Sequence, residues 1–90
     1  MAELEQIKHD RSAIYGDPEE NHKGIGMAWT PLLQPHVEAI ARGEPLPAWV
    51  VTLLLTAVKI NRMRRVMHQD NFDDAHIYLE FVNDFQKRGV

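Results

Sequence analysis

Acidic and basic side chains gather in three short segments of the chain, and their chemistry suits a metal ion or a phosphate group. Residues 15–22 read YGDPEENH, residues 59–65 read KINRMRR, and residues 70–78 read DNFDDAHIY. Carboxylates are ligands for hard cations such as Mg²⁺, whereas lysine and arginine hold phosphate oxygens. If the fold brings the three segments together, they form a site for a metal, a phosphate or both.

Four carboxylates are candidate metal ligands. Asp70 and Asp74 lie at positions i and i+4, so a helix places both on one face, where they could share Mg²⁺. Glu19 and Glu20, from another helix, would complete an oxygen-rich shell with waters. Such a site could hydrolyse a phosphoanhydride bond through a metal-activated water. The alternative is an ion-pair network that ties helix ends together without any ligand.

Further polar side chains are candidates for holding the rest of a ligand. Lys59 and Arg62 would hold phosphate oxygens, the arginine through a bidentate fork. Tyr15 would stack on the ligand or form a hydrogen bond with it. The whole ligand-binding set consists of Tyr15, Asp17, Asn21, Lys59, Arg62 and Tyr78. No residue is assigned a catalytic role.

Several other kinds of site are not favoured. The chain has no cysteine, which excludes disulfides, thiolate metal sites and cysteine nucleophiles. Its histidines do not form a zinc-ligand pattern, and it has no glycine-rich phosphate loop. The formal net charge of −3 provides no general attraction for nucleic acid, and acids lie close to the arginines of residues 62–65. We therefore do not expect nucleic acid as a partner.

Length and composition predict a single domain over residues 1–90. The first residues are acidic and lack the apolar stretch of a signal peptide. The longest apolar run, near residues 49–55, is far too short to span a bilayer. The lack of cysteine fits a reducing compartment. We expect a cytoplasmic protein with no membrane partner.

Helical periodicity and helix-end signals predict an all-α fold, a small bundle of about four helices. Residues 3–14 are expected to form the first, amphipathic helix. Asp17 as a cap, Pro18 in the first turn and Glu20 three residues after the cap predict the start of the second. Pro31 should kink or restart this second helix, and Pro35 should open a short helix that closes near residue 43.

The third main helix, about residues 48–66, is apolar around most of its circumference, so it should be central or buried between subunits. The fourth runs from near residue 70 to near residue 87. Its expected buried stripe is Phe72, Ala75, Leu79, Val82 and Phe85 or Gln86. A chain this short cannot wrap the third helix fully, so we expect a homo-oligomer, most simply a dimer.

Short connections favour antiparallel neighbours, and this direction brings the polar segments together. The start of the second helix, the end of the third and the start of the fourth should meet at one end of the bundle. Asp70 and Asp74 should then lie near Lys59 or Arg62. Residues 17–22 should close the same pocket.

The chain resembles a family of small uncharacterised proteins from tailed phages and prophages over about residues 11–80. The resemblance is carried by the YGDPEEN stretch at residues 15–21, by Trp29, by a leucine, lysine and arginine near Leu54, Lys59 and Arg62, and by the DN-x-x-D-x-x-x-Y pattern of residues 70–78. It implies a phage protein in the cytoplasm of an infected bacterium.

More distantly, residues 70–79 are similar to the last motif of MazG-like nucleotide pyrophosphohydrolases. Those enzymes are all-α, oligomeric and Mg²⁺-dependent, and they cleave nucleoside triphosphates to monophosphates. Asp74 would match the metal-binding aspartate, with Asp70 as an acid one turn before it. The family carries a glutamate-rich motif on the preceding core helix, whereas residues 50–56 here contain no carboxylate. Glu19 and Glu20 would have to substitute.

The resemblance implies a role in phage nucleotide metabolism. One form of it is Mg²⁺-dependent pyrophosphohydrolysis of a nucleotide, or a relic of that activity. The alternative is a non-catalytic phage protein that sequesters a nucleotide signal or binds and inhibits a host protein.

Overall fold

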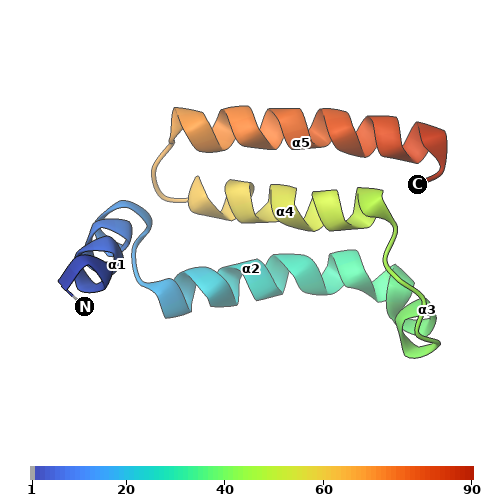
Figure 1. Ribbon diagram of the computed structural model, residues 1–90, viewed down its shortest axis with the longest axis horizontal. Coiled ribbons are helices and arrows are strands. Elements are labelled where there is room, and N and C mark those ends of the chain that lie inside the picture. Colours follow the sequence, from blue (N-terminus) through green and yellow to red (C-terminus); the bar gives the residue numbers. More distant parts are fainter. Residues whose placement is uncertain (1) are drawn as a thin grey trace.

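Every regular element of the described chain is helical (Figure 1). The computed structural model describes the backbone of residues 2–90 and the side chains of residues 3–11 and 16–90. The elements are α1 (Ala2–Tyr15), α2 (Pro18–Leu33), the 3₁₀ turn η1 (Gln34–His36), α3 (Val37–Ala41), α4 (Ala48–Arg62) and α5 (Gln69–Arg88). The expected all-α class is confirmed, and α1, α2, α4 and α5 correspond to the four predicted helices.

The start of α2 follows the sequence signals closely. Asp17 is the N-cap, and its carboxylate accepts a hydrogen bond of 3.2 Å from the backbone N–H of Glu20. Pro18 is the first helical residue, where its missing N–H costs nothing. Gly16, with φ of +83°, makes the turn between α1 and α2. These residues position the YGDPEEN segment at a helix N-terminus.

Pro31 lies inside α2, which continues to Leu33, so the helix does not restart at this proline. The helix ends only two residues later, so the proline removes one hydrogen bond from the last turn rather than from the interior. The chain then tightens into η1 and the short α3, and Gly43, with φ of +80°, closes this segment as expected. The resulting corner returns the chain to the start of α4.

The helices α4 and α5 differ from their predicted bounds at the polar turn that joins them. The helix α4 ends at Arg62 rather than at residue 66, because residues 63 and 64 form tighter i→i+3 bonds. The helix α5 begins at Gln69 with His68 as its N-cap, so Asp70 lies in the first turn. Gly89, with a φ of +72°, ends α5 in the left-handed conformation expected of a C-terminal glycine.

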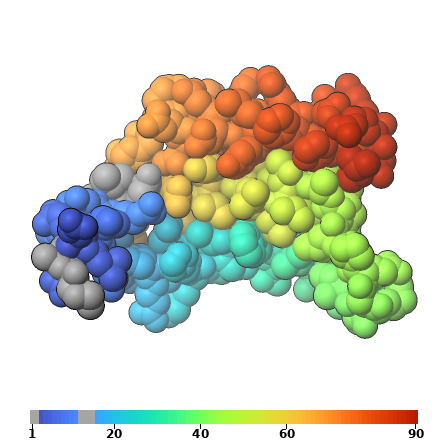
Figure 2. Space-filling model, in the orientation of Figure 1, coloured from blue at the N-terminus to red at the C-terminus, as the bar shows by residue number. Residues whose placement is uncertain are grey.

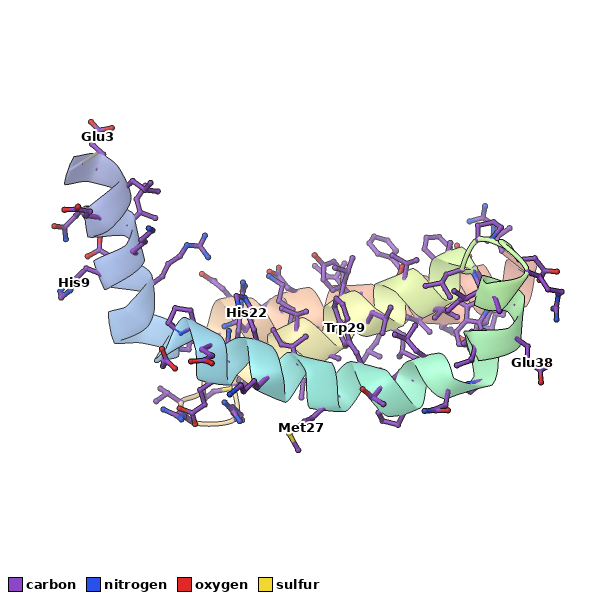
Figure 3. All side chains as sticks on the ribbon, turned by 90° about the horizontal axis from the view of Figure 1, so that it is seen from below. Glu3, His9, His22, Met27, Trp29 and Glu38 are labelled. Carbon is purple, nitrogen blue, oxygen red and sulfur yellow. The ribbon has the colours of Figure 1, made fainter. Side chains whose placement is uncertain are left out.

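Three antiparallel helices form a flat layer, with α4 between α2 and α5 (Figures 1 and 3). The contacts of α4 with α5 are the more extensive of its two interfaces. The apolar side chains buried in the described chain are Ile25, Val50, Leu54, Ala57, Ala75 and Val82. This core follows the two seams of the layer, so both broad faces of α4 stay open.

The three polar segments meet at one end of this layer, as the antiparallel arrangement predicted (Figure 1). The start of α2, the end of α4 and the start of α5 all lie there, and α1 joins the layer at the same end. The helix α1 rises out of the plane of the layer (Figure 3). Leu4 and Ile7, two residues of its predicted apolar face, are exposed.

The buried stripe of α5 is rotated relative to the prediction. Ala75 and Val82 are buried as expected, but Phe72 and Leu79 are about half exposed. Asn71 is buried in their place, with only 3% of its surface accessible. This rotation turns Asp74 toward α4, where its carboxylate pairs with a lysine. The same rotation of α5 therefore accounts for both its buried stripe and this ion pair.

Many large apolar side chains remain accessible on the layer. On α4 they include Val51, Leu55 and Ile60, so the other helices leave this helix partly uncovered. None of the described helices combines the length and the apolar character needed to cross a membrane.

Candidate functional site

A pair of asparagines joins α2 to α4 at the polar end of the layer. The side-chain amide of Asn61 donates to the Asn21 side-chain oxygen at 2.6 Å and to the Asn21 backbone carbonyl at 3.1 Å. The contact is possible because Gly24 leaves space: a Cβ at residue 24 would lie 2.6 Å from Oδ1 of Asn61. These bonds fix the register of the two helices that form the site.

Glu20 is paired with arginines from the turn after α4. Its carboxylate forms an ion pair with Arg65 and a longer one, at 3.9 Å, with Arg64. All three side chains are exposed, so the pairs add little stability, but they tie residues 64–65 to the start of α2. The carboxylate of Glu20 is thus engaged by cations rather than directed at a metal position.

Lys59 forms the most sheltered ion pair of the site. Its ammonium lies 3.0 Å from a carboxylate oxygen of Asp74, and its side chain is only 18% exposed, against 46% for Asp74. The predicted proximity of Asp74 to Lys59 is therefore confirmed. The pair connects α4 to α5 just beside the polar turn.

Asp74→Ala is expected to lower the free energy of unfolding by about 1–2 kcal/mol, because it leaves the largely buried ammonium of Lys59 without its partner. Urea unfolding at neutral pH measures the change. Asp84→Ala is the matched control, since Asp84 pairs with Arg88 on the exposed surface of α5, and it should cost less than about 0.5 kcal/mol. Equal losses in the two variants would contradict the assigned role of the Lys59 pair.

The other predicted residues have separate surroundings. Glu19 pairs with Lys23 on the exposed side of α2, at 3.4 Å. Asp70 is exposed in the first turn of α5, and Tyr78 lies half-buried one helical turn beyond Asp74. Asp17 is occupied as the cap of α2. The side chain of Tyr15 lies outside the described residues.

The four candidate metal ligands do not form one group in a single chain. Among the described side chains, no three histidine, aspartate or glutamate residues lie close enough together to hold a metal ion. Glu20 and Asp74 face arginine and lysine partners, Glu19 pairs with Lys23, and Asp70 is exposed in the first turn of α5. As the structure describes them, the four carboxylates therefore do not surround one common metal position.

A groove runs between α2 and α4 from the polar end toward the middle of the layer. Its larger part has a volume of about 420 Å³ and is lined by Asn21, His22, Ile25, Gly26, Trp29, Val58 and Arg62. A second hollow of about 140 Å³ continues it toward α1, lined by Arg11, Gly16, Pro18, Asn21, His22 and Arg62. The two share three lining residues, so they form one depression with an apolar part and a cationic part.

Trp29 is held in a defined position in this groove by a hydrogen bond to α4. Its indole N–H donates to the carbonyl of Leu54 on α4 at 2.8 Å, which fixes the ring beside Val58. In Figure 3, Trp29 and His22 point to the side on which α1 rises, whereas Met27 points away from it. Arg11 lines the smaller hollow toward α1, and Arg62 lines both parts, so this end of the depression carries positive charge.

Sequence reasoning identified part of this groove. Asn21 and Arg62 were predicted ligand residues, and both line it. Trp29 was recognised in the family pattern but was not selected as a ligand residue, and neither was Asn61. Asn61 in the largely apolar α4 was a usable signal, because a polar side chain in such a helix needs a partner.

The described chain is thus an all-α layer with a groove between α2 and α4 on one of its faces. The chain belongs to the DUF6378 family, a domain of unknown function, whose family model matches residues 2–86. Comparison with curated proteins and with solved structures finds no match.

Proposed function

We propose that the protein binds a nucleotide in the groove between α2 and α4. The observation that carries the proposal is the composition of this groove, in which an oriented tryptophan and aliphatic side chains continue into a cluster of cationic side chains. A nucleotide has the same two parts, a flat base and an anionic phosphate chain.

The size and chemistry of the groove support this ligand class. A volume of about 420 Å³ lies in the range of small-molecule sites, roughly 300–1,000 Å³. Trp29 lines the groove together with Ile25 and Val58, and aromatic side chains bind bases by stacking. Arg62 and Arg11 line the cationic part of the groove, and guanidinium groups suit phosphate oxygens. Lys59, predicted to bind phosphate, pairs with Asp74.

The resemblance to phage and prophage proteins supports a role in the nucleotide metabolism of an infected bacterium. Binding in the groove is common to sequestration of a nucleotide signal and to a pyrophosphohydrolase or its relic. Hydrolysis with Mg²⁺ rests on the resemblance of residues 70–79 alone. Inhibition of a host protein rests on the phage resemblance alone. We therefore propose binding as the primary function.

A fluorescence titration tests the proposal. Trp49→Phe leaves Trp29 as the only tryptophan, and Trp49 lies outside the groove, where its ring meets His36 edge-on at 5.6 Å. We expect a saturable change in Trp29 emission with nucleoside mono- or triphosphates. A larger effect of the nucleotide than of the nucleoside or inorganic pyrophosphate alone would show that both halves of the groove contribute.

The same titration is run with and without Mg²⁺, and released pyrophosphate is measured in parallel. Pyrophosphate release that Asp74→Ala abolishes would add the hydrolase activity to the binding function. An unchanged emission of Trp29 with all common nucleotides at millimolar concentration would exclude nucleotide binding in this groove.

A further inference from the structure

One chain exposes more surface than a folded protein of its size should. Its accessible area is 6647 Å² at a mass of 10.4 kDa, whereas a compact monomer of that mass exposes about 5,400 Å². Its radius of gyration is 15.5 Å, against roughly 12 Å for a compact domain of this length. The excess, about 1,200 Å², exceeds the roughly 800 Å² that each partner loses in a standard protein interface.

Part of this surface is an apolar face on the groove side of the layer, which we call the groove face. On α4, Val51, Leu55 and Val58 follow each other at helical spacing, and Val58 lines the groove together with Ile25 and Trp29 of α2. Val51 and Leu55 are 43% and 45% exposed. The centre of the groove face thus joins two helices by apolar side chains.

The groove face continues onto α5. Lys59 lies one turn after Leu55 and pairs with Asp74, which shows which flank of α5 adjoins this side of the layer. Phe81 lies seven residues after Asp74 on the same flank, is about half exposed, and stacks on Phe85 with 6.0 Å between the ring centres. Figure 2 looks onto this side, where α2, α4 and α5 lie next to one another and α1 stands at one end.

We propose that a second copy of the chain packs on the groove face and thereby closes the ligand groove. The excess accessible area is large enough for a partner of standard interface size. The small buried core favours a second copy as that partner. A chain with so few buried apolar side chains gains stability from association, and a second copy is always present where the first is made. Twofold dimers are also the commonest symmetric assemblies.

The second copy would change the groove from an open depression into a site enclosed between two chains. In a twofold dimer the middle of α4 meets its own counterpart, so Leu55 lies near the symmetry axis and Trp29 beside it. A nucleotide base on Trp29 would then be covered from the other chain. The ligand part of this inference rests on the proposed nucleotide binding, whereas the dimer does not.

Light scattering with size-exclusion chromatography tests the dimer in the full chain. We expect twice the mass of 10.4 kDa at micromolar concentration, and a melting temperature that rises with protein concentration. Leu55→Lys should weaken association by about a hundredfold or more, because two unpaired ammonium groups enter the apolar centre. Ile60→Lys is the matched control, since Ile60 is 54% exposed on the opposite face of α4, and it should remain a dimer.

Circular dichroism covers the case in which Leu55→Lys does not fold. Leu55 is exposed within one chain, so unfolding of Leu55→Lys beside a folded, dimeric Ile60→Lys supports an obligate dimer through the groove face. A monomeric wild type, a dimeric Leu55→Lys, or an Ile60→Lys that dissociates would each overturn the proposal. A monomer that binds nucleotide refutes only the dimer, and a dimer that binds no nucleotide refutes only the binding function.

Discussion

Gly24→Ala is expected to destabilise the protein, whereas Gly26→Ala, two residues further along α2, is expected to stabilise it. A Cβ at residue 24 would lie 2.6 Å from Oδ1 of Asn61 and 3.2 Å from a guanidinium nitrogen of Arg64. The Asn61 side chain would have to turn away and give up its bonds to Asn21. That loss and the overpacking outweigh the better helix propensity of alanine, for a net cost of about 1–2 kcal/mol.

Gly26 is the control in the same helix, because a Cβ there meets nothing within 4 Å. The substitution should therefore stabilise by about 0.5–1 kcal/mol through helix propensity alone. Thermal unfolding by circular dichroism should show melting temperatures of the two variants separated by roughly 10 °C or more. Shifts of the same sign and size would show that the close approach of α2 to α4 at residue 24 does not matter.

Arg62→Gln is expected to weaken nucleotide binding by about tenfold or more, because it removes a charged, bidentate donor from the point where the two parts of the groove join. The change in affinity is measured by titrating the Trp49→Phe background. The loss should be larger for triphosphates than for nucleosides, which lack the anionic chain.

The matched control for Arg62→Gln is Arg88→Gln. Arg88 lies in the last turn of α5, far from the polar end of the layer. Arg88 is exposed and paired with Asp84 at 2.9 Å, and it takes no part in the groove. Its replacement changes the net charge equally but should leave the affinity unchanged. An equal loss in both variants would indicate nonspecific attraction to a phosphate chain, and an unchanged affinity in Arg62→Gln would remove Arg62 from the site.

The helices and their direction could be predicted because their signals are local. Asp17, Pro18 and Gly89 act within a few residues of their own position, and short connections then define the antiparallel order. The pairing of Lys59 with Asp74 followed from that order. The predicted length of α4 was wrong by four residues, since apolar periodicity alone does not report where the backbone tightens.

The groove and the register of α5 depended on contacts between distant segments. The sequence pattern treated Phe72 and Leu79 as buried because they are large and apolar, but Asn71 occupies the interior instead. Glycine is a weak helix former, yet the lack of a side chain at Gly24 allows the asparagine contact of α2 with α4. Such effects depend on which surfaces meet, which no local pattern encodes.

The central position of α4 has a consequence for how the protein opens. Because α4 and α5 share the larger interface, α2 can detach while the α4–α5 hairpin remains folded. Amide hydrogen exchange should then divide the chain into cooperative units, slowest in α4 and α5, intermediate in α2 and fastest in α1. A ligand that bridges α2 and α4 would slow exchange in α2 most, because it raises the free energy of that partial opening.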